Sequence, residues 1–355
     1  MNARADTLVH LAAPNMALQK LAQHMAEHGL EPRALATHQI IVEHEGCSIE
    51  LDAGISGLSV TITAPSENML YFLKEAAAQH VAEIDAVAAE KIRWSDGIAA
   101  QSTPSNFREL AVVNRREIFP GMMRITLKCD DVRALTMDGL HVKLMLPSDR
   151  TRKAVWPSVA ANGVTVWPRG NDALHVRYFT LRDVNAVTGE VDIDVVQHQG
   201  GMISDWAACA SIGDKIGVMG PGGGSVPSVA GRIFLAGDKT ALPAIARIMD
   251  TLPASIDGTV FVAGPTSRSI DEYLPSTKMR VNVFEPERFD EIVIPAIEEA
   301  AREATFDYAW FAGEFDTATA ARRLFKGKFG LKKANQLSVS YWRRGLRGNA
   351  EKEEV

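Results

Sequence analysis

The chain has few cysteines, no long apolar run and no excess of basic residues, and each shortage excludes a class of protein. Its three cysteines, Cys47, Cys129 and Cys209, lie far apart and form no CxxC pair. This number is too small for an iron–sulfur cluster held by four thiolates of one chain, and sparse thiols are typical of a reducing, cytoplasmic compartment. No run approaches 18 apolar residues, so no membrane-spanning helix is expected. The net charge of −6 argues against a nucleic-acid-binding protein, which needs a basic surface.

The composition is that of a globular protein, with 46% hydrophobic and 23% charged residues over 355 positions, enough for two or three domains. Residues 1–97 predict a small α+β domain. Apolar residues at helical spacing indicate a first helix between Asn15, its expected N-cap, and Gly29, which is expected just after its end. Residues 39–63 indicate strands separated by glycine turns, and a second helix is expected after Ser66.

A polar stretch at residues 95–106 predicts a linker to two further domains. Residues 105–228 hold short runs rich in β-branched residues without long helical patterns, which predicts an antiparallel β-barrel. Residues 229–350 alternate strands with helices, which predicts a parallel sheet with crossover helices. The expected barrel strands begin near residues 110, 122, 141, 174 and 191, and the expected sheet strands near residues 233, 259, 280, 308 and 337.

The first cluster that can carry chemistry is an expected barrel strand, the run Arg-Tyr-Phe-Thr-Leu-Arg at residues 177–182. Alternate side chains of a strand face opposite sides, so Arg177 and Phe179 share one face, and Tyr178, Thr180 and Arg182 share the other. Aromatic, hydroxyl and guanidinium groups together suit a flat flavin and its diphosphate, because arginine offers forked donors to phosphate. An ordinary barrel strand with arginines at its rim is the alternative.

A glycine turn before a short helical stretch is a candidate anion site. It is the run His198-Gln199-Gly200-Gly201-Met202-Ile203-Ser204-Asp205-Trp206. Consecutive backbone N–H groups at a helix N-terminus attract an anion, and glycine lets the ligand approach closely. Ser204 is expected to cap the helix or to bind a phosphate oxygen. A plain glycine turn with an N-cap is the alternative.

A third cluster follows the first strand of the expected parallel sheet, where the turn into a helix holds Gly237, Asp238, Lys239, Thr240 and Ala241. Ligands of such sheets meet the carboxyl ends of strands and the N-termini of helices, so this turn predicts a nucleotide site. The usual GxGxxG fingerprint of dinucleotide sites is missing from it.

The turn after the second sheet strand bears on the choice of coenzyme. Its Ser267 and Arg268 favour the 2′-phosphate of NADPH, whereas an acidic residue there would favour NADH, which stays possible. A polar loop without a ligand is the alternative. Further along, residues 317–350 contain nine Lys and Arg and no Asp or Glu. That stretch predicts either a solvated helix face or a local positive field for a polyanion.

Six of the nine histidines fall within residues 1–97. His24 and His28 lie one helical turn apart, which is the spacing of a metal-ligand pair. Because no carboxylate or thiolate spacing completes the set, no metal site is predicted.

With these motifs in view, residues 107–345 resemble the siderophore-interacting protein family, which are FAD-dependent ferric-siderophore reductases of ferredoxin-reductase-like architecture. In the barrel span, the family pattern R-x-Y-[ST]-x-R matches at Arg177, Thr180 and Arg182. The pattern H-x-x-G-P-A-S-x-W matches at His198, Gly201, Ser204 and Trp206.

In the sheet span, the family pattern G-D-E-T-A-L-P-A matches from residue 237 to 244 except at Lys239. A late G-E pair matches Gly313 and Glu314, and the final Y-W-R-R-G matches residues 341–345. Residues 6–94 are similar to a small domain of unassigned function that is fused to such reductases.

The resemblance implies a six-stranded Greek-key barrel that holds FAD, followed by an NAD(P)H-binding parallel-sheet domain. It assigns residues 177–180 to the flavin and its ribityl chain, and residues 201–204 to the pyrophosphate. The motifs and the resemblance together give these cofactor-binding residues: Arg177, Tyr178, Phe179, Thr180, Arg182, His198, Gly201, Met202, Ile203, Ser204, Trp206, Gly237, Asp238, Thr240, Ala241, Ser267, Arg268, Gly313, Glu314, Tyr341 and Trp342.

Three departures separate this chain from the family pattern. Phe179 replaces a tyrosine, so a hydroxyl near the flavin is lost unless Tyr178 supplies it through a shifted register. Met202 and Ile203 replace proline and alanine, a change that keeps the backbone donors. Lys239 replaces an acidic residue and reverses the charge at the turn of the nicotinamide domain.

The predicted activity is NAD(P)H-dependent reduction of a ferric siderophore, with FAD and NADPH as cofactors and no catalytic side chain, since the cofactor carries the chemistry. Tyr341 and Trp342 are expected beside the flavin. Lys239, Arg343 and Arg344 are expected to attract an anionic ferric chelate. Two alternatives stay open: a flavin reductase for another acceptor, such as a quinone or a protein partner, and a non-catalytic siderophore-binding module with a vestigial flavin site.

Overall fold

The computed structural model describes residues 2–27, 30–44, 46–97, 102–132, 135–136, 139–223, 231–253 and 255–346. The chain divides into two compact units. The first comprises Met1–Phe107 with Pro147–Leu174, and the second comprises Arg108–Leu146 with His175–Val355. The first unit is therefore discontinuous, because it takes residues 147–174 from inside the span that was expected to form only the barrel. Within the described residues, none of the helices combines the length and the apolar character needed to cross a membrane.

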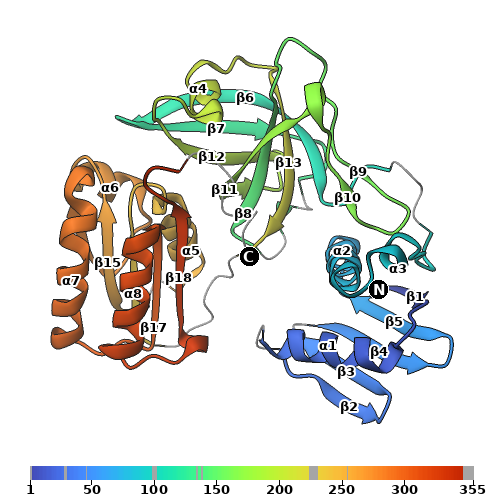
Figure 1. Ribbon diagram of the computed structural model, residues 1–355. Helices are drawn as coiled ribbons and strands as arrows, with labels where there is room; N and C mark the ends of the chain where they lie inside the picture. Colours follow the sequence, from blue (N-terminus) through green and yellow to red (C-terminus); the bar gives the residue numbers. More distant parts are fainter. Residues whose placement is uncertain are drawn as a thin grey trace. The chain divides into compact units, whose positions relative to one another are not determined.

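The first unit is built on a five-stranded antiparallel sheet in the order β1-β5-β4-β3-β2 (Figure 1). Its strands are β1 (Ala3–Val9), β2 (Arg33–Ala36), β3 (Gln39–His44), β4 (Cys47–Gly54) and β5 (Gly57–Ala64). Alternate residues of β5 such as Leu58, Val60 and Ile62 are buried in one apolar core with helices α1 (Pro14–Glu27), α2 (Glu67–Ile84) and α3 (Ala86–Glu90). The expected α+β composition is confirmed, and β1 and β2 add strands that the sequence pattern did not indicate.

The two predicted helix starts have different outcomes. The first is wrong, because α1 begins at Pro14 and Asn15 lies inside its first turn. Proline suits the first helical position, where its missing N–H needs no partner. Gly29, expected after this helix, lies outside the described residues. The second start is confirmed: Ser66 is the N-cap of α2, and its side chain accepts a hydrogen bond from the backbone N–H of Met69.

The start of the predicted linker belongs to this unit. The backbone N–H of Ser95 donates to the carbonyl of Asp6 (2.9 Å). Lys74 is buried on α2, and its Nζ lies 2.5 Å from the carboxylate of Asp96. A buried ammonium needs such a counter-charge, so this pair holds residues 95–96 against the helix.

Residues 147–174 add a small hairpin to the first unit, with strands β9 (Ser158–Val159) and β10 (Thr165–Val166) and a 3₁₀ turn at Gly170–Asp172. The hydroxyls of Tyr71 and Thr165 lie 2.6 Å apart, and Trp94 Nε1 donates to the carbonyl of Asn162 (2.9 Å). Burial raises the pKa of Tyr71 to about 12, so its phenol stays protonated and can serve this contact. Buried polar contacts of this kind fix the insertion to the helices of its own unit.

The second unit opens with a closed six-stranded barrel in the order β11-β12-β7-β6-β13-β8. Its strands are β6 (Phe107–Phe119), β7 (Met122–Lys128), β8 (His141–Pro147), β11 (Leu174–Asn185), β12 (Glu190–Val196) and β13 (Lys215–Gly222). The non-sequential pairing of β12 with β7 gives the Greek-key connection. The predicted barrel is therefore confirmed, with β13 as a sixth strand beyond the five that the pattern indicated.

The parallel-sheet domain completes this unit with the strand order β16-β15-β14-β17-β18 (Figure 1). Its strands are β14 (Ile233–Gly237), β15 (Gly258–Ala263), β16 (Arg280–Phe284), β17 (Tyr308–Glu314) and β18 (Gln336–Trp342). Its helices are α5 (Leu242–Thr251), α6 (Ser267–Tyr273), α7 (Phe289–Glu303) and α8 (Phe315–Gly327), with 3₁₀ turns at Pro286–Arg288 and Lys333–Asn335. All five predicted strands are confirmed, and helices alternate with them as predicted.

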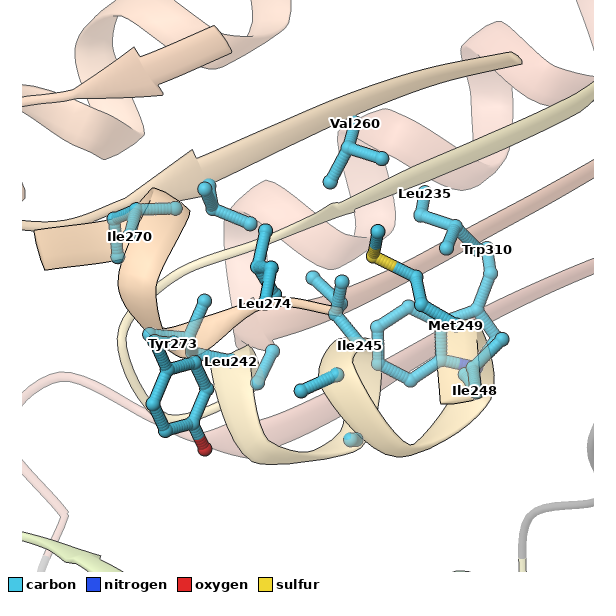
Figure 2. Packing of buried hydrophobic residues seen from close by; sticks show 14 of the residues in the cluster. Leu235, Leu242, Ile245, Ile248, Met249, Val260, Ile270, Tyr273, Leu274 and Trp310 are labelled. Carbon is cyan, nitrogen blue, oxygen red and sulfur yellow. The ribbon is translucent and has the colours of Figure 1, made fainter. Parts of the chain in front are cut away.

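Both faces of this sheet are covered, which explains why β14 is apolar at every position. Leu235 packs with α5 and α6 on one face, and Phe234 packs with α7 and α8 on the other. Figure 2 shows the first of these cores, where Leu242 and Ile245 of α5 lie near Tyr273 and Leu274. Continuous burial of this kind is typical of parallel sheets with helices on both sides.

The barrel docks on the α5–α6 side of the sheet. Phe119, Met122 and Leu140 of the barrel belong to the same apolar core as α5 and α6. The rings of Phe119 and Tyr273 meet edge to face with centroids 5.8 Å apart. Barrel and sheet therefore share one core and form one unit.

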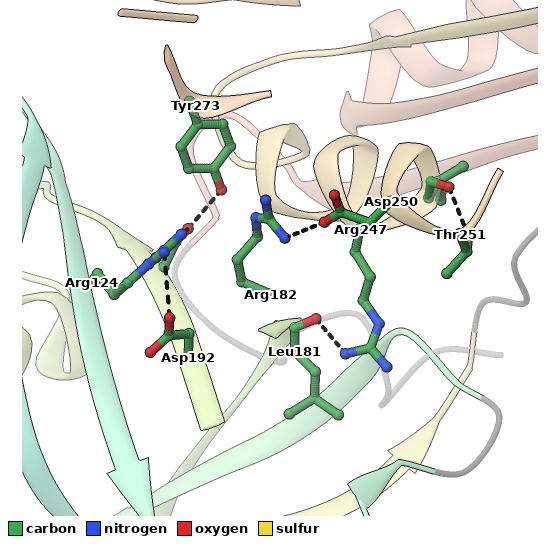
Figure 3. A network of polar contacts seen from close by, with 10 residues as sticks. Arg124, Leu181, Arg182, Asp192, Arg247, Asp250, Thr251 and Tyr273 are labelled. Atoms are coloured by element: carbon green, nitrogen blue, oxygen red, sulfur yellow. Dashed lines mark hydrogen bonds and ion pairs between the residues drawn. The ribbon is translucent and has the colours of Figure 1, made fainter. Parts of the chain in front are cut away.

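A buried polar network crosses this contact (Figure 3). Arg124 of β7 donates through Nε and Nη2 to the two carboxylate oxygens of Asp194 on β12, at 2.7 Å each. Asp194 also accepts a hydrogen bond from the hydroxyl of Tyr273 at the end of α6 (2.6 Å), and its side chain is 0% exposed. Asp192, on the same strand, lies 3.3 Å from Arg124 Nη1. One carboxylate thus joins a barrel arginine to a sheet-domain tyrosine.

We expect Asp194→Ala to lower the free energy of unfolding by about 3–5 kcal/mol, because it leaves the Arg124 guanidinium in a dry contact without its bidentate partner. The measurement is urea unfolding of the full chain. Asp192→Ala is the matched control: its side chain is 22% exposed, so its loss should cost only about 1 kcal/mol. Equal costs for the two variants would contradict this assignment.

Candidate functional site

The strand order places a topological switch point at the carboxyl edge of the sheet. From β14 the chain builds β15 and β16 to one side and then β17 and β18 to the other, so the order reverses between β14 and β17. Helices that follow these two strands cover opposite faces and leave room at this reversal, where ligands of open α/β sheets bind. Three sequence-predicted pairs end here: Gly237-Asp238 after β14, Gly313-Glu314 on β17 and Tyr341-Trp342 on β18.

Asp238 connects two of these pairs. Its carboxylate accepts hydrogen bonds from the backbone N–H and hydroxyl of Thr240 (2.7 and 2.6 Å) and from Trp342 Nε1 (2.6 Å). Burial raises the pKa of Asp238, although the hydrogen bonds from these donors act to lower it. The aspartate therefore holds the turn before α5 and the end of β18 together, so residues more than 100 positions apart meet as the motifs implied.

Glu314 is a helix cap. Its carboxylate accepts from the backbone N–H groups of Asp316 (2.6 Å) and Thr317 (3.3 Å) at the start of α8, and from that of Arg344 (3.2 Å). Burial acts to raise the pKa of Glu314, but the three N–H donors and the Arg344 charge outweigh it and lower the pKa. The side chain thus organises the loop after β18, and both carboxylate oxygens already have protein partners.

Two glycines let these strand ends approach. A Cβ on Gly237 would lie 2.4 Å from the Ala241 Cβ and 2.6 Å from the Ala312 carbonyl oxygen. A Cβ on Gly313 would lie 3.0 Å from an Asp238 carboxylate oxygen. The glycine at each position is a packing requirement, which places the turn before α5 directly against the end of β17.

The barrel presents Thr180 of β11 and His141 of β8 to the same edge. Thr180 Oγ1 lies 3.4 Å from His141 Nδ1, and the Tyr341 hydroxyl lies 3.0 Å from His141 Nε2. Burial, with the nearby Arg247 charge, lowers the pKa of His141 to about 4, so its ring is neutral at pH 7. Burial raises the pKa of Tyr341, so that residue stays a phenol. His141 was not predicted, because a single histidine at a strand start matches no motif.

Strand β11 divides its residues as the alternation predicted. Phe179 and Leu181 pack on the barrel interior, whereas the Tyr178 ring is 55% exposed and has Lys143 Nζ 5.7 Å from its centroid. The irregularity in the pairing of β11 with β12 lies between Leu181 and Asp183, beyond both rings. Tyr178 and Phe179 therefore face opposite sides of the strand, and Tyr178 is the one with an exposed ring.

Arg182 has a different role from the predicted cofactor contact. It forms a 2.6 Å ion pair with Asp250 of α5, and its guanidinium lies 5.5 Å from the Tyr273 ring centroid. Arg247 of α5 donates to the Leu181 carbonyl alongside it (2.7 Å; Figure 3). Arg182 thus joins the barrel to the sheet domain.

The glycine turn before α4 (Met202–Cys209) provides an open helix start. Its N-cap is Gly201, with no side-chain capping bond. The expectation that Ser204 caps the helix is wrong: its hydroxyl accepts from the backbone N–H of His198 (2.9 Å) and donates to the carbonyl of the same residue (3.0 Å). The first N–H groups of a helix have no intrahelical partner, so those of Met202 and Ile203 can bind an anion.

Two further motif residues support this turn from inside the barrel. The side chains of Ile203 and Trp206 are 2% and 1% exposed and belong to the barrel core. Trp206 therefore fixes α4 on the barrel, and its ring has no surface left for the cofactor contact that the motif implied. A Cβ on Gly201 would lie 2.2 Å from the His198 ring, which explains the glycine at that position.

Arg177 is a half-buried cation without a carboxylate partner among the described residues. Its only side-chain hydrogen bond there runs to its neighbour, the Val176 carbonyl (2.6 Å). Burial lowers the pKa of Arg177, and no acidic group offsets this effect. A bound anion stabilises a partly desolvated guanidinium more than one that is fully solvated. With the open start of α4 and the exposed Tyr178 ring, these groups fit the diphosphate and the flat rings of FAD.

Comparison with known proteins agrees with this geometry. The model for the siderophore-interacting FAD-binding domain matches residues 111–225, and the model for siderophore-interacting protein matches residues 230–345, together more than half of the chain. The chain belongs to the siderophore-interacting protein family. The ferric vibriobactin reductase ViuB of Vibrio cholerae is 27% identical over 255 residues, which cover 70% of this chain and 93% of that protein.

Two further relatives cover the same region. The NADPH-dependent ferric-chelate reductase of Escherichia coli is 35% identical over 150 residues, which cover 41% of this chain and 57% of that protein. The crystal structure of a siderophore utilization protein from T. fusca superposes with a TM-score of 0.60 at 29% identity, over 70% of this chain and 97% of that one. The barrel and the sheet of this siderophore-interacting protein are thus the matched part.

The turn expected to select the coenzyme lies at the start of α6. Thr266 is the N-cap, and its hydroxyl accepts from the backbone N–H of Ser269 (3.1 Å). The Arg268 side chain is 88% exposed, and its Nε lies 2.9 Å from the carboxylate of Glu272 one turn later. Ser267 and Arg268 thus follow β15 at the carboxyl edge. The Glu272 carboxylate would compete with a phosphate for the Arg268 guanidinium.

The three basic residues expected to attract a chelate differ in how they are paired. Lys239 is exposed in the turn after β14. The Arg343 guanidinium lies 4.4 Å from the Phe315 ring centroid. Arg344 Nη2 lies 3.0 Å from the carboxylate of Asp290, so its charge is partly neutralised. Lys239 is accordingly a stronger candidate than Arg344.

Proposed function

We propose that this siderophore-interacting protein is an FAD-dependent reductase that takes electrons from NADPH and reduces the iron of a ferric siderophore, which releases Fe²⁺. The observation that carries the proposal is the meeting of Thr180 and His141 of the barrel with Tyr341 at the carboxyl edge of the sheet, where the neighbouring Trp342 is bound to Asp238. A flavin held on the first pair faces the edge where a nicotinamide nucleotide binds. The ferric reductases of Vibrio cholerae and Escherichia coli named above support the same activity.

FAD would be held along β11 and at the start of α4. Arg177 and the backbone N–H groups of Met202 and Ile203 suit the diphosphate, and Thr180 and Tyr178 suit the flavin side. When bound, the flavin lets a two-electron donor serve a one-electron acceptor. The remaining predicted contacts, Gly237, Thr240 and Ala241, line the turn where the coenzyme would approach.

His141 and Tyr341 position this edge without exchanging protons with solvent at neutral pH. The ring of His141 is neutral, so one ring nitrogen donates and the other accepts, between Thr180 and the Tyr341 hydroxyl. Tyr341 packs against the buried Trp310 of β17, with ring centroids 6.4 Å apart. Tyr341 and Trp310 together keep water from the contact between barrel and sheet. Tyr341 is the residue on which the flat flavin ring can stack.

Lys239 and Arg343 would draw the ferric chelate to this edge. Siderophores bind Fe³⁺ through hard anionic oxygen ligands, which hold Fe²⁺ much less tightly, so reduction releases the metal. Positive side chains beside the site raise the local concentration of an anionic complex. The reversal from an acidic residue to Lys239 fits an acceptor with more negative charge.

NADPH is the proposed donor, with Ser267 and Arg268 at the 2′-phosphate. We place the reaction in the cytoplasm, because Cys47, Cys129 and Cys209 are free thiols and Cys209 is exposed, a combination that suits a reducing compartment.

The direct test is a visible spectrum of the purified full chain. We expect bound FAD, bleaching of its absorption by NADPH under anaerobic conditions, and recovery on addition of a ferric siderophore with release of Fe²⁺ to a ferrous chelator. Recovery with a quinone but not with ferric complexes would favour a reductase for another acceptor. A colourless protein that binds a ferric siderophore would favour a binding module. Either outcome overturns the proposal.

For the chelate, we expect Lys239→Ala to raise KM for anionic ferric complexes about 2–5-fold, since an exposed charge pair contributes up to about 1 kcal/mol. The effect should shrink at high salt. Lys326→Ala is the matched control, because Lys326 is exposed in the last turn of α8, at the opposite edge of the sheet. An unchanged KM in Lys239→Ala, or an equal rise in Lys326→Ala, would contradict the role of Lys239.

For the coenzyme, we expect Arg268→Ala to raise KM for NADPH about fivefold and to leave KM for NADH unchanged, because only NADPH carries the extra phosphate. Glu272→Gln should act in the other direction by freeing the arginine from its carboxylate partner. Steady-state kinetics with both coenzymes measures this. Equal effects on NADH and NADPH would mean that Arg268 does not contact the 2′-phosphate.

A further inference from the structure

The first unit brings together two histidines and a glutamate from separate helices. His24 lies in the last turn of α1, and His80 and Glu83 lie in the last turns of α2. One potential ligand atom from each of the three lies within 4.8 Å of the others. The sequence indicated His24 with His28 instead, and His28 lies outside the described residues. The packing of α1 against α2 supplies the second histidine from more than 50 positions away.

The detailed geometry suits a shared metal ion. The His24 and His80 ring centroids lie 4.1 Å apart with the rings tilted by 53°, so their nitrogens can point to one place. His80 Nδ1 lies 3.5 Å from a carboxylate oxygen of Glu83. Bonds of about 2.0–2.2 Å from each ligand to a metal separate ligand atoms by about 3–3.5 Å, so small side-chain rotations complete the set.

Exposure and charge at this cluster favour a cation. His24 and His80 are partly buried and Glu83 is exposed, so an ion has an entry path and a side open to water. The cluster lies at the C-terminal ends of both helices, where the helix dipole carries partial negative charge.

We propose that His24, His80 and Glu83 form a binding site for a first-row divalent metal ion, with Fe²⁺ as its natural occupant. Two imidazoles and one carboxylate with open positions are the ligand set that proteins use for Fe²⁺, and Zn²⁺ and Co²⁺ also accept it. The choice of Fe²⁺ rests on the proposed function, because ferric-siderophore reduction on the same chain produces that ion. The first unit then receives the released iron and holds it with water-accessible coordination positions.

The test measures metal binding by the metal-free full chain in equilibrium dialysis. The probes are Co²⁺, which is coloured, and Fe²⁺ under anaerobic conditions. We expect one equivalent of each ion, and a Co²⁺ absorption band of nitrogen and oxygen ligation. His24→Ala and His80→Ala should each weaken binding by at least about tenfold, since even outer-shell changes cost that much. Glu83→Gln keeps the side-chain shape and removes the charge, and it should weaken binding as well.

The matched control is the double variant His38→Ala/His44→Ala, which removes two exposed histidines of the β2–β3–β4 region of the same unit. It should retain one equivalent of metal. Absence of stoichiometric binding by the natural chain, or binding that all variants retain, overturns the proposal. Flavin reduction by NADPH is measured on the same samples. Ferric reduction without metal binding would overturn only the proposed metal site. Metal binding without ferric reduction would overturn only the proposed function.

Discussion

The carboxylate of Asp194 is the contact on which the catalytic half of this protein depends. It is fully buried and binds Arg124 through both oxygens. It also accepts a hydrogen bond from the hydroxyl of Tyr273 in the sheet domain. An unpaired charge there would be costly, so barrel and sheet are held in the one arrangement that satisfies all three groups. The surrounding apolar core contributes most of the attraction, and the polar network determines which orientation is adopted.

This orientation brings the site together. With the α5–α6 side of the sheet against the barrel, Tyr341 of β18 reaches His141, which in turn lies beside Thr180. Arg182 strengthens the docking through its ion pair with Asp250. The carboxylates of Asp238 and Glu314 accept hydrogen bonds from groups of the chain around this edge of the sheet. Several residues of the family motifs thus shape the site, and in the proposed reductase the contacts to the diphosphate are left to Arg177 and to backbone N–H groups.

The first unit has its own core and its own chemistry. Its sheet and helices are completed by residues 147–174, which the chain supplies between two barrel strands. A reductase that discharges a reactive ferrous ion benefits from a protein ligand for that ion on the same chain. The histidine–glutamate cluster offers such ligands, and it arises only because α1 and α2 end side by side.

The sequence by itself determined the element types, the barrel and parallel-sheet classes and most motif positions, because hydrophobic periodicity and glycine turns are local signals. It also placed the start of a helix after Ser66 and the order of the sheet strands along the chain. Only the tertiary structure decided that Trp206 belongs to the core, that Ser204 closes a loop, and that His141 meets Tyr341. It also brought His80 of α2 beside His24 of α1. These outcomes depend on contacts between distant segments, which no local pattern records.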